Sequence, residues 1–176
     1  MESSRPLPRL PVRQVTLVPI LPIAGVAINM IAAALRSRGI QVQASAPIHR
    51  PRGSYDAGRR QFRAEALLEG MTQRPERPVL GLTDADCYAG TLNFVFGIAD
   101  LHSGAAVVSL ARLRAGASAS TFTARAVKEI IHELGHAVGL GHCAHSRCVM
   151  HFSNSLAEAD AKGEELCASC SQRLAK

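Results

Sequence analysis

The chain has 176 residues, the size of a single domain, and its 20 basic and 14 acidic side chains give a formal net charge of +6. Hydrophobic residues make up 47% of the chain and charged residues 19%, which excludes a largely disordered protein. Aromatic residues account for only 4%, so aliphatic side chains must build the core. Four of the five cysteines follow residue 142, and this uneven distribution indicates specialised chemistry near the C-terminus.

The predicted elements alternate between strands and helices. Residues 1–13, with prolines among arginines and serines, predict a disordered segment ahead of a single domain at residues 14–176. Pro19 should end the first strand and Gly39 the first helix. In chain order we expect a strand at 15–18, a helix at 23–38, a strand at 40–44, a helix at 56–71, strands at 78–82, 92–99 and 105–113, and a helix ending near 138.

Two of the predicted helices begin at a residue that can cap them, Ser54 for the second and Thr123 for the third. The early strand–helix–strand order implies parallel pairing, because such crossovers return the chain in the same direction. Residues 100–104 have the length and composition of a hairpin turn, which places an antiparallel strand in the same sheet. The predicted fold class is therefore α/β with a mixed sheet.

The most apolar stretch, residues 15–28, is too short to cross a bilayer, which takes about 20 residues, and it contains two prolines. Three arginines precede it, as in a secretory signal peptide, but a strand followed by a helix explains the stretch better. We therefore expect no membrane partner and a cytoplasmic rather than a secreted protein.

The positive charge is concentrated in residues 1–77, which hold twelve arginines and five acidic residues. The densest group runs from Arg50 to Arg63 and offers only Tyr55 and Phe62 for stacking on bases. No RNA-binding signature accompanies it. A solvated, arginine-rich surface explains the pattern, and nucleic acid is not the expected partner.

The third predicted helix carries His132-Glu133-Leu134-Gly135-His136. Because an α-helix turns 100° per residue, His132 and His136 lie 40° apart and can bind one metal ion together. Gly139 allows the chain to leave the helix in a left-handed conformation, and the turn would bring His142 round as a third ligand. Together these residues form the complete metzincin signature. The alternative, a surface helix with solvated histidines, requires the whole pattern to arise by chance.

Three neutral imidazoles leave zinc its full charge, which lowers the pKa of a bound water toward ~7. Glu133 is next to His132 and is the candidate general base for that water. Each histidine ligand needs an acceptor for its second ring nitrogen. Asp84, Asp86 and Asp100 are candidates that the sequence does not rank.

The four C-terminal cysteines have the spacing C-x4-C-x18-C-x2-C, formed by Cys143, Cys148, Cys167 and Cys170. Four thiolates can close a tetrahedral structural zinc site that leaves no position for a substrate. Two disulfides are the competing interpretation, although Cys-x-x-Cys is a poor structural disulfide and a common zinc knuckle. Cys87 stands apart, and we expect it to be a small buried side chain.

The stretch HELGHAVGLGHCAHSRCVM, followed by the Cys-x-x-Cys pair, resembles the archaemetzincins, zinc peptidases of the metzincin clan. Segments 81–84 and 93–97 extend the resemblance over most of the chain. The resemblance implies a compact single domain with a mixed sheet, a long active-site helix and a C-terminal zinc-knuckle tail. It places Met150 in the Met-turn beneath the catalytic zinc. It also implies an edge strand beside the substrate cleft, for which residues 105–113 are the candidate.

The chain departs from the pattern of its relatives in two places. Sixteen residues separate Met150 from Cys167, one fewer than in the family pattern, and a loop absorbs such a change easily. Some metzincins have a Tyr just past the Met that stabilises the transition state, whereas His151 follows here, so no residue is assigned to that role. We expect His145 and His151 to be solvated rather than to replace a ligand.

The main hypothesis is a zinc-dependent metallopeptidase with one catalytic and one structural zinc ion. The resemblance implies small peptides as substrates, with aminopeptidase-type cleavage among the options, and we expect a monomer. The alternative is a zinc-stabilised binding module with a vestigial peptidase site, directed to nucleic acid by its basic half. The intact Glu133 argues against that module, since a metal-binding scaffold needs no carboxylate there. The same ligands would also support metal-assisted hydrolysis of a non-peptide substrate.

Overall fold

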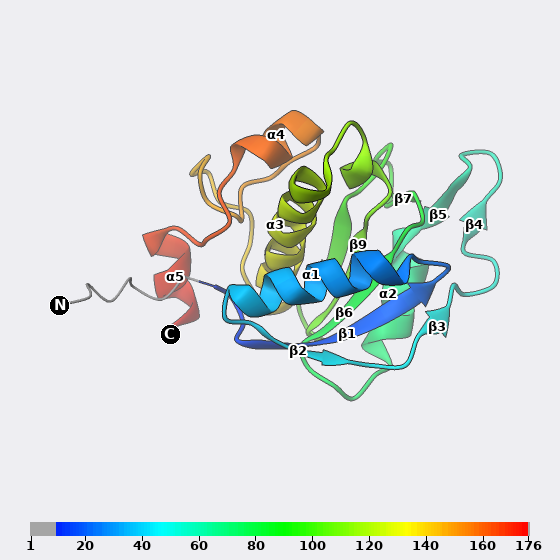
Figure 1. The fold of residues 1–176 in the computed structure, drawn as a ribbon, viewed down its shortest axis with the longest axis horizontal. Helices are drawn as coiled ribbons and strands as arrows, with labels where there is room; N and C mark the ends of the chain where they lie inside the picture. Colours follow the sequence, from blue (N-terminus) through cyan, green and yellow to red (C-terminus); the bar gives the residue numbers. More distant parts are fainter. Residues whose placement is uncertain (1–9, 176) are drawn as a thin grey trace.

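The structure is a computed structural model that describes residues 10–175. A mixed sheet is covered by helices α1 and α3 on one face and by α2 on the other (Figure 1). The sheet order is β2-β1-β6-β9-β8, with β3 also paired to β1. These elements are β1 (Gln14–Leu21), α1 (Gly25–Ser37), β2 (Gln41–Ala44), β3 (Ile48–His49), α2 (Ala64–Thr72), β6 (Val79–Thr83), β8 (Gly97–Asp100), β9 (Ala105–Ser109) and α3 (Ala119–Ala137).

Alternate side chains of β1 enter two separate cores, as the period of two in a strand requires. Leu17 packs with α1 and α3, and Val18 packs with α2 on the other face. Strand β1 pairs in parallel with β2, β3 and β6, and β6 pairs in parallel with β9. The antiparallel pair is β8 with β9, joined by the predicted hairpin turn. The α/β class with a mixed sheet and an antiparallel edge strand is therefore confirmed.

The predicted helix over residues 56–71 is wrong in its first half. A small second sheet takes those residues, and the helix α2 begins only at Ala64. Gln61 is buried, and its side-chain amide donates to Asp86 and to the carbonyl of Asn93. The Ser54 hydroxyl donates to the Pro51 carbonyl and caps no helix. The strands of this sheet are β4 (Tyr55–Asp56), β5 (Gln61–Arg63) and β7 (Cys87–Tyr88).

The predicted edge strand at residues 105–113 is also wrong. Strand β9 is interior and ends at Ser109, and the short 3₁₀ helix η1 (Arg112–Arg114) follows it. The edge is β8, which begins at Gly97, so the predicted strand at 92–99 forms only at its end. Helix α3 begins before Thr123, because the Ser118 hydroxyl accepts a hydrogen bond from the Thr121 N–H and caps it.

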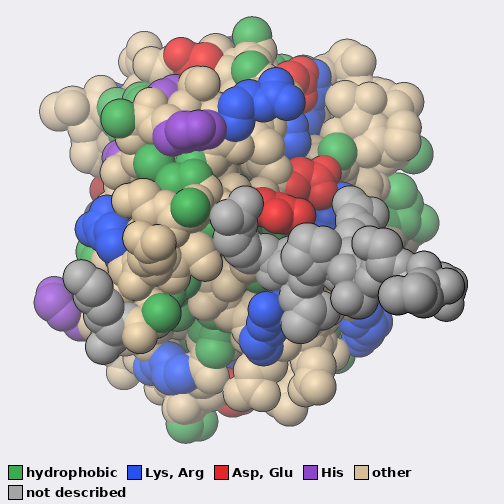
Figure 2. Space-filling view, turned by 90° about the vertical axis from the view of Figure 1, so that its left-hand side faces the viewer, with side chains coloured by type: hydrophobic (Ala, Val, Ile, Leu, Met, Phe, Trp, Pro, Cys, Tyr) green, Lys and Arg blue, Asp and Glu red, His purple; other side chains and the backbone are tan. Residues whose placement is uncertain are grey.

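After α3, the chain forms α4 (Leu156–Ala161), which lies beside α3, and α5 (Ala168–Leu174), which lies at the end of the molecule away from β4 and β5 (Figure 1). The predicted disordered segment falls largely on residues 1–9, outside the described residues, and Val12 within its described part is buried in the core. Among the described helices, none has the length and apolar character to span a membrane. On the face shown in Figure 2, acidic and basic side chains are interspersed.

Candidate active site

Helix α3 is buried along most of its length, which gives the site a rigid base. Val127, Ile131 and Leu134 are fully buried against the sheet and α1, as their helical spacing predicts. His132 and His136 lie on the other side of the helix and line a cavity. The helix therefore has a packing face and a chemical face, and the packing face holds the chemical one in place.

The helix ends where the sequence predicts a left-handed turn. Gly139 has φ of +96°, a conformation that favours glycine, and its N–H donates to the His136 carbonyl at 2.9 Å. Leu140 N–H reverses the chain by donating to the Gly135 carbonyl at 2.9 Å. This reversal brings the ring of His142 to within 4.8 Å of the His136 ring, measured between centroids.

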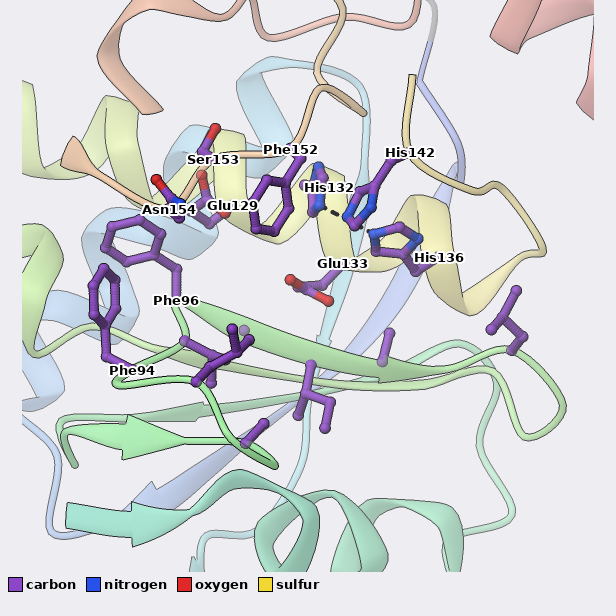
Figure 3. Close-up of a pocket in the computed structure, with 17 residues that line it drawn as sticks. Phe94, Phe96, Glu129, His132, Glu133, His136, His142, Phe152, Ser153 and Asn154 are labelled. Carbon is purple, nitrogen blue, oxygen red and sulfur yellow. Dashed lines mark hydrogen bonds between the residues drawn. The ribbon is translucent and has the colours of Figure 1, made fainter. Parts of the chain in front are cut away.

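The three predicted histidine ligands meet at one point, and Figure 3 shows their rings turned toward one another. Each offers a nitrogen within 4.8 Å of the other two. The Nε2 atoms of His132 and His136 are 3.0 Å apart, close to the ~3.3 Å that tetrahedral zinc with Zn–N bonds of about 2.0–2.1 Å requires. Burial lowers the pKa of His132 to about 2 and lowers those of His136 and His142. Neutral imidazoles at this spacing fit a zinc ion.

Backbone carbonyls orient two of these rings. His132 Nδ1 lies 2.8 Å from the Val149 carbonyl, and His136 Nδ1 lies 2.7 Å from the Leu140 carbonyl. Each ring therefore has its Nδ1 hydrogen-bonded and its Nε2 directed at the metal position.

None of the three aspartates proposed for this role performs it. Asp84 pairs with Arg114, Asp86 pairs with Arg112, and Asp100 accepts from backbone N–H groups in its own turn. The acceptors are backbone carbonyls, which every residue carries, so the sequence could not identify them.

Glu133 points into the space beneath the histidines (Figure 3) and packs against Gly97 of the edge strand. A Cβ at Gly97 would lie 2.7 Å from Oε1 of Glu133, so only glycine leaves room for this carboxylate. Burial, and then the nearby charge of Glu129, raises the pKa of Glu133 to about 8. A zinc dication at the histidines would favour the charged form and oppose this shift.

Met150 is fully buried and packs against Gly135 of the active-site helix. A Cβ on Gly135 would collide with the Met150 sulfur, so this glycine in the helix allows the two to pack together. The carbonyl of Met150 accepts from the Cys143 N–H at 2.9 Å, and the Val149 carbonyl contacts His132. The segment around Met150 thus contacts both the helix and the His132 ring, and its assignment as a Met-turn stays a prediction from the resemblance.

The four C-terminal cysteines form a second cluster directly beyond His142. All four sulfurs lie within 4.8 Å of one another, and those of Cys143 and Cys167 are 3.8 Å apart. Tetrahedral zinc with Zn–S bonds of about 2.3 Å places sulfurs ~3.8 Å apart, whereas a disulfide bond is about 2.05 Å long. All five cysteines are free, which favours metal binding over the disulfide interpretation. The N–H of Cys170 lowers the pKa of Cys167 to about 7, whereas burial raises the pKa of Cys148 and of Cys170.

Comparison with known proteins places this pair of clusters in a family. The model of peptidase family M54 matches residues 55–176. A Methanopyrus kandleri protein named archaemetzincin is 47% identical over 127 residues, covering 70% of this chain and 71% of the relative. The chain belongs to peptidase family M54, the archaemetzincins. It is a zinc metallopeptidase.

Solved structures agree with this membership. The crystal structure of archaemetzincin from Archaeoglobus fulgidus complexed with malonate is similar with a TM-score of 0.82 and 32% identity, covering 91% of this chain and 99% of that one. The crystal structure of the Methanopyrus kandleri archaemetzincin has a TM-score of 0.79 and 36% identity, covering 96% of this chain and 97% of that one. The fold is thus that of the M54 peptidases.

In this M54 peptidase the histidines open into a cavity of about 360 Å³. Its walls are largely apolar and come from the segment before β8, from β8 itself and from the residues after Met150. Three exposed hydrophobic side chains line it: Leu92, Leu101 and Phe152. This volume is at the lower end of the roughly 300–1,000 Å³ typical of ligand sites.

The remaining sequence candidates lie outside the ligand sets. Cys87 is buried as expected, and its burial raises the pKa of the thiol to about 12. His145 is exposed, and His151 Nδ1 lies 2.9 Å from the Cys143 carbonyl. Sequence reasoning missed Glu129, which lines the cavity one helical turn before Glu133. The sequence did contain a signal for this residue, because Glu129 is an acidic side chain among the apolar positions of α3.

Proposed function

We propose that this chain hydrolyses peptide bonds with one zinc ion held by His132, His136 and His142 and with Glu133 as general base. The observation that carries the proposal is the convergence of three neutral imidazoles and one buried carboxylate on a single open cavity. Bound zinc supplies a Lewis acid that polarises the scissile carbonyl and makes water more acidic.

The chain's own residues account for the proton transfers. Glu133 accepts a proton from the attacking water and delivers it to the leaving amine as the C–N bond breaks, so the carboxylate is regenerated at the end of the cycle. Gly97 leaves the space in which the carboxylate sits. Met150 and Gly135 hold the base of the site, so the histidines keep their spacing.

We further propose that the substrate binds as an extended strand along β8. The far side of β8 is free of strand pairing among the described elements, and β8 lines the cavity from Gly97 to Ala99. An unpaired edge offers backbone N–H and carbonyl groups to a peptide. The hydrophobic side chains at the cavity would contact the side chains of the peptide.

The cysteine cluster is proposed to hold a second zinc ion, which gives two per chain. Four thiolates close the coordination shell, so this ion has no position for a substrate. Because Cys143 follows His142 directly, the second site would hold the third ligand of the first. Four free thiols also favour a reducing compartment such as the cytoplasm.

A peptide or small protein is the proposed partner of a monomeric chain, and nucleic acid is not. Phe62, one of two aromatic residues in the arginine-rich region, is covered by the Arg50 guanidinium at 4.6 Å from the ring centroid. Its ring is therefore occupied, which weakens the case for stacking on bases.

Cleavage of a mixed peptide library tests the proposal, with wild type compared to Glu133→Gln. We expect the variant to keep its zinc and to lose activity by about 10²–10⁴-fold, the usual contribution of a general base. Glu69→Gln, an exposed change on α2, is the matched control and should behave as wild type. Equal cleavage by wild type and Glu133→Gln, or no cleavage of any peptide by the zinc-loaded wild type, would contradict the proposal.

A further inference from the structure

A buried ion pair lies against the cavity, apart from the metal ligands. Glu129 Oε1 is 3.0 Å from Lys162 Nζ, and the two side chains are 4% and 0% exposed. Burying two charges is expensive, and apolar residues of similar volume often serve stability as well or better. A pair of this kind at the cavity therefore calls for a functional explanation.

The pair leaves hydrogen-bonding capacity on the Glu129 carboxylate. Among residues 10–175, Lys162 is its ion-pair partner, and Oε1 has no hydrogen-bond donor there. The Lys162 ammonium lies 3.5 Å from the His151 carbonyl, which ties it to the segment after Met150. The His151 carbonyl thus holds the Lys162 ammonium in place, and Glu129 is the member of the pair that lines the cavity.

The surroundings of Glu129 combine apolar walls with polar atoms at one end. Phe94, Phe96 and Phe152 line the same cavity, and Figure 3 shows Glu129 on the side away from His136, near Ser153 in this view. The Ser153 Oγ is buried and has no hydrogen-bond partner among the described residues. This end of the cavity therefore holds a carboxylate and a hydroxyl that a ligand could satisfy.

We propose that this end of the cavity binds a substrate side chain that has an apolar body and an uncharged hydrogen-bond donor at its tip, as in tyrosine, and that Glu129 accepts its hydrogen bond. The aromatic walls suit a ring, and the phenol supplies the donor. A lysine or arginine fits less well because Lys162 already neutralises Glu129 and would repel a second cation. This inference rests on the proposed peptidase function, since it concerns the residue beside the cleaved bond.

The test compares peptides that differ only in having Tyr, Phe or Lys at one position flanking the cleaved bond, with each side varied in turn. We expect zinc-loaded wild type to prefer Tyr over Phe by about ten-fold or more in kcat/KM at one of the two positions, because Phe would leave the buried acceptor unpaired. Equal or better cleavage of the Phe peptide at both positions, or a preference for Lys, would overturn the inference.

The double variant Glu129→Leu/Lys162→Met removes both charges together and leaves no unpaired ion. Its kcat/KM values for the Tyr and Phe peptides should become equal, while Glu69→Gln keeps the Tyr preference. Ser153→Ala provides a second, milder variant, in which the Tyr preference should fall by a few-fold. Retention of the full Tyr preference by a folded double variant would exclude Glu129 as the acceptor.

Binding provides a readout that is independent of turnover. Zinc-loaded Glu133→Gln should bind the Tyr peptide about ten-fold more tightly than the Phe peptide in fluorescence anisotropy. Equal affinities would contradict the inference. If wild type cleaves no peptide, the proposed function fails; if it cleaves peptides without distinguishing Tyr from Phe, only the present inference fails.

Discussion

The histidine cluster and the cysteine cluster adjoin in sequence, yet they are built in opposite ways. The histidines offer three donor atoms at the mouth of a cavity, and His142 is exposed. The cysteines offer four donor atoms, and Cys148 and Cys170 are buried. Three ligands leave zinc a position for water and substrate, whereas four close its coordination shell. The number of ligands and their access to solvent thus separate a reactive site from a structural one.

The two clusters are joined directly in the chain, and this link predicts how one site depends on the other. His142 and Cys143 are consecutive, and the Cys143 N–H and carbonyl contact Met150 and His151. A metal ion bound by the cysteines would therefore fix the loop that carries the third histidine. We expect no reverse dependence, because the packing of the helix holds His132 and His136 in place without a metal ion. Loss of the metal ion from the cysteine site should therefore weaken metal binding at the histidine site. Loss of the metal ion from the histidine site should leave the cysteine site intact.

The largest expected effect is on activity. His142→Ala should lower peptide cleavage by about a thousand-fold or more, because the histidine site loses its metal. The cysteine site should keep its zinc, so metal analysis should find one ion per chain and a melting temperature near that of wild type. His145→Ala, in the same loop and also exposed, is the control and should keep full activity. Loss of both metal ions in His142→Ala would show that the dependence runs in both directions.

A cysteine substitution should have the largest effect on stability. Cys148→Ser removes a buried ligand, and the free energy of unfolding should fall by about 4 kcal/mol or more because metal binding contributes to folding. Activity should fall as well, since the loop with His142 loses its anchor. Cys87→Ala, in the other core, should lower stability modestly and leave the zinc content unchanged. A stable, fully active Cys148→Ser would contradict a structural role for the cluster.

A smaller effect is expected where Met150 packs under the helix. Gly135→Ala places a methyl group against the Met150 sulfur, and such overpacking costs about 1–3 kcal/mol in urea unfolding. Gly141→Ala is the matched control, since nothing lies within 4 Å of a Cβ there and its stability should stay close to wild type. Equal stabilities of the two variants would mean that the close approach of Gly135 and Met150 is not required.

The smallest effect concerns the ion pair between α3 and α4, Arg125 with Asp160 at 2.7 Å. The hydrogen bond from Arg125 holds the pKa of Asp160 below its ordinary value of 3.8. A lowered folded-state pKa stabilises the protein above the unfolded value, and this contribution is lost as the pH falls through the folded-state pKa. Asp160→Asn should therefore be less stable than wild type by about 0.2–1 kcal/mol at pH 7, and the difference should disappear as the pH falls through the folded-state pKa of Asp160. A difference that persists in acid would exclude the ion pair as its cause.

The local features of the site were predictable from the sequence. The 40° offset between His132 and His136, the left-handed Gly139 and the spacing of the cysteines are all short-range properties. Each depends on helix geometry or on the conformational preference of one residue type. The structure groups these residues as predicted.

The features that were mispredicted or missed depend on tertiary structure. The position of β8 at the edge follows from strand order, which no local pattern records. Residues 56–63 form two short strands and a turn because β4 pairs with β5 and β5 pairs with β7, which overrides a helical pattern. The acceptors for His132 and His136 are backbone carbonyls, and Lys162 reaches Glu129 from a distant part of the chain.

The most direct test of the division between the two sites is native mass spectrometry of the zinc-loaded protein during titration with a chelator, with peptide cleavage and melting temperature measured on the same samples. We predict two zinc ions per chain. The first should leave together with activity and with little change in melting temperature, and the second should leave only as the protein unfolds. A single zinc ion per chain, or simultaneous loss of both ions with activity and fold, would contradict the account.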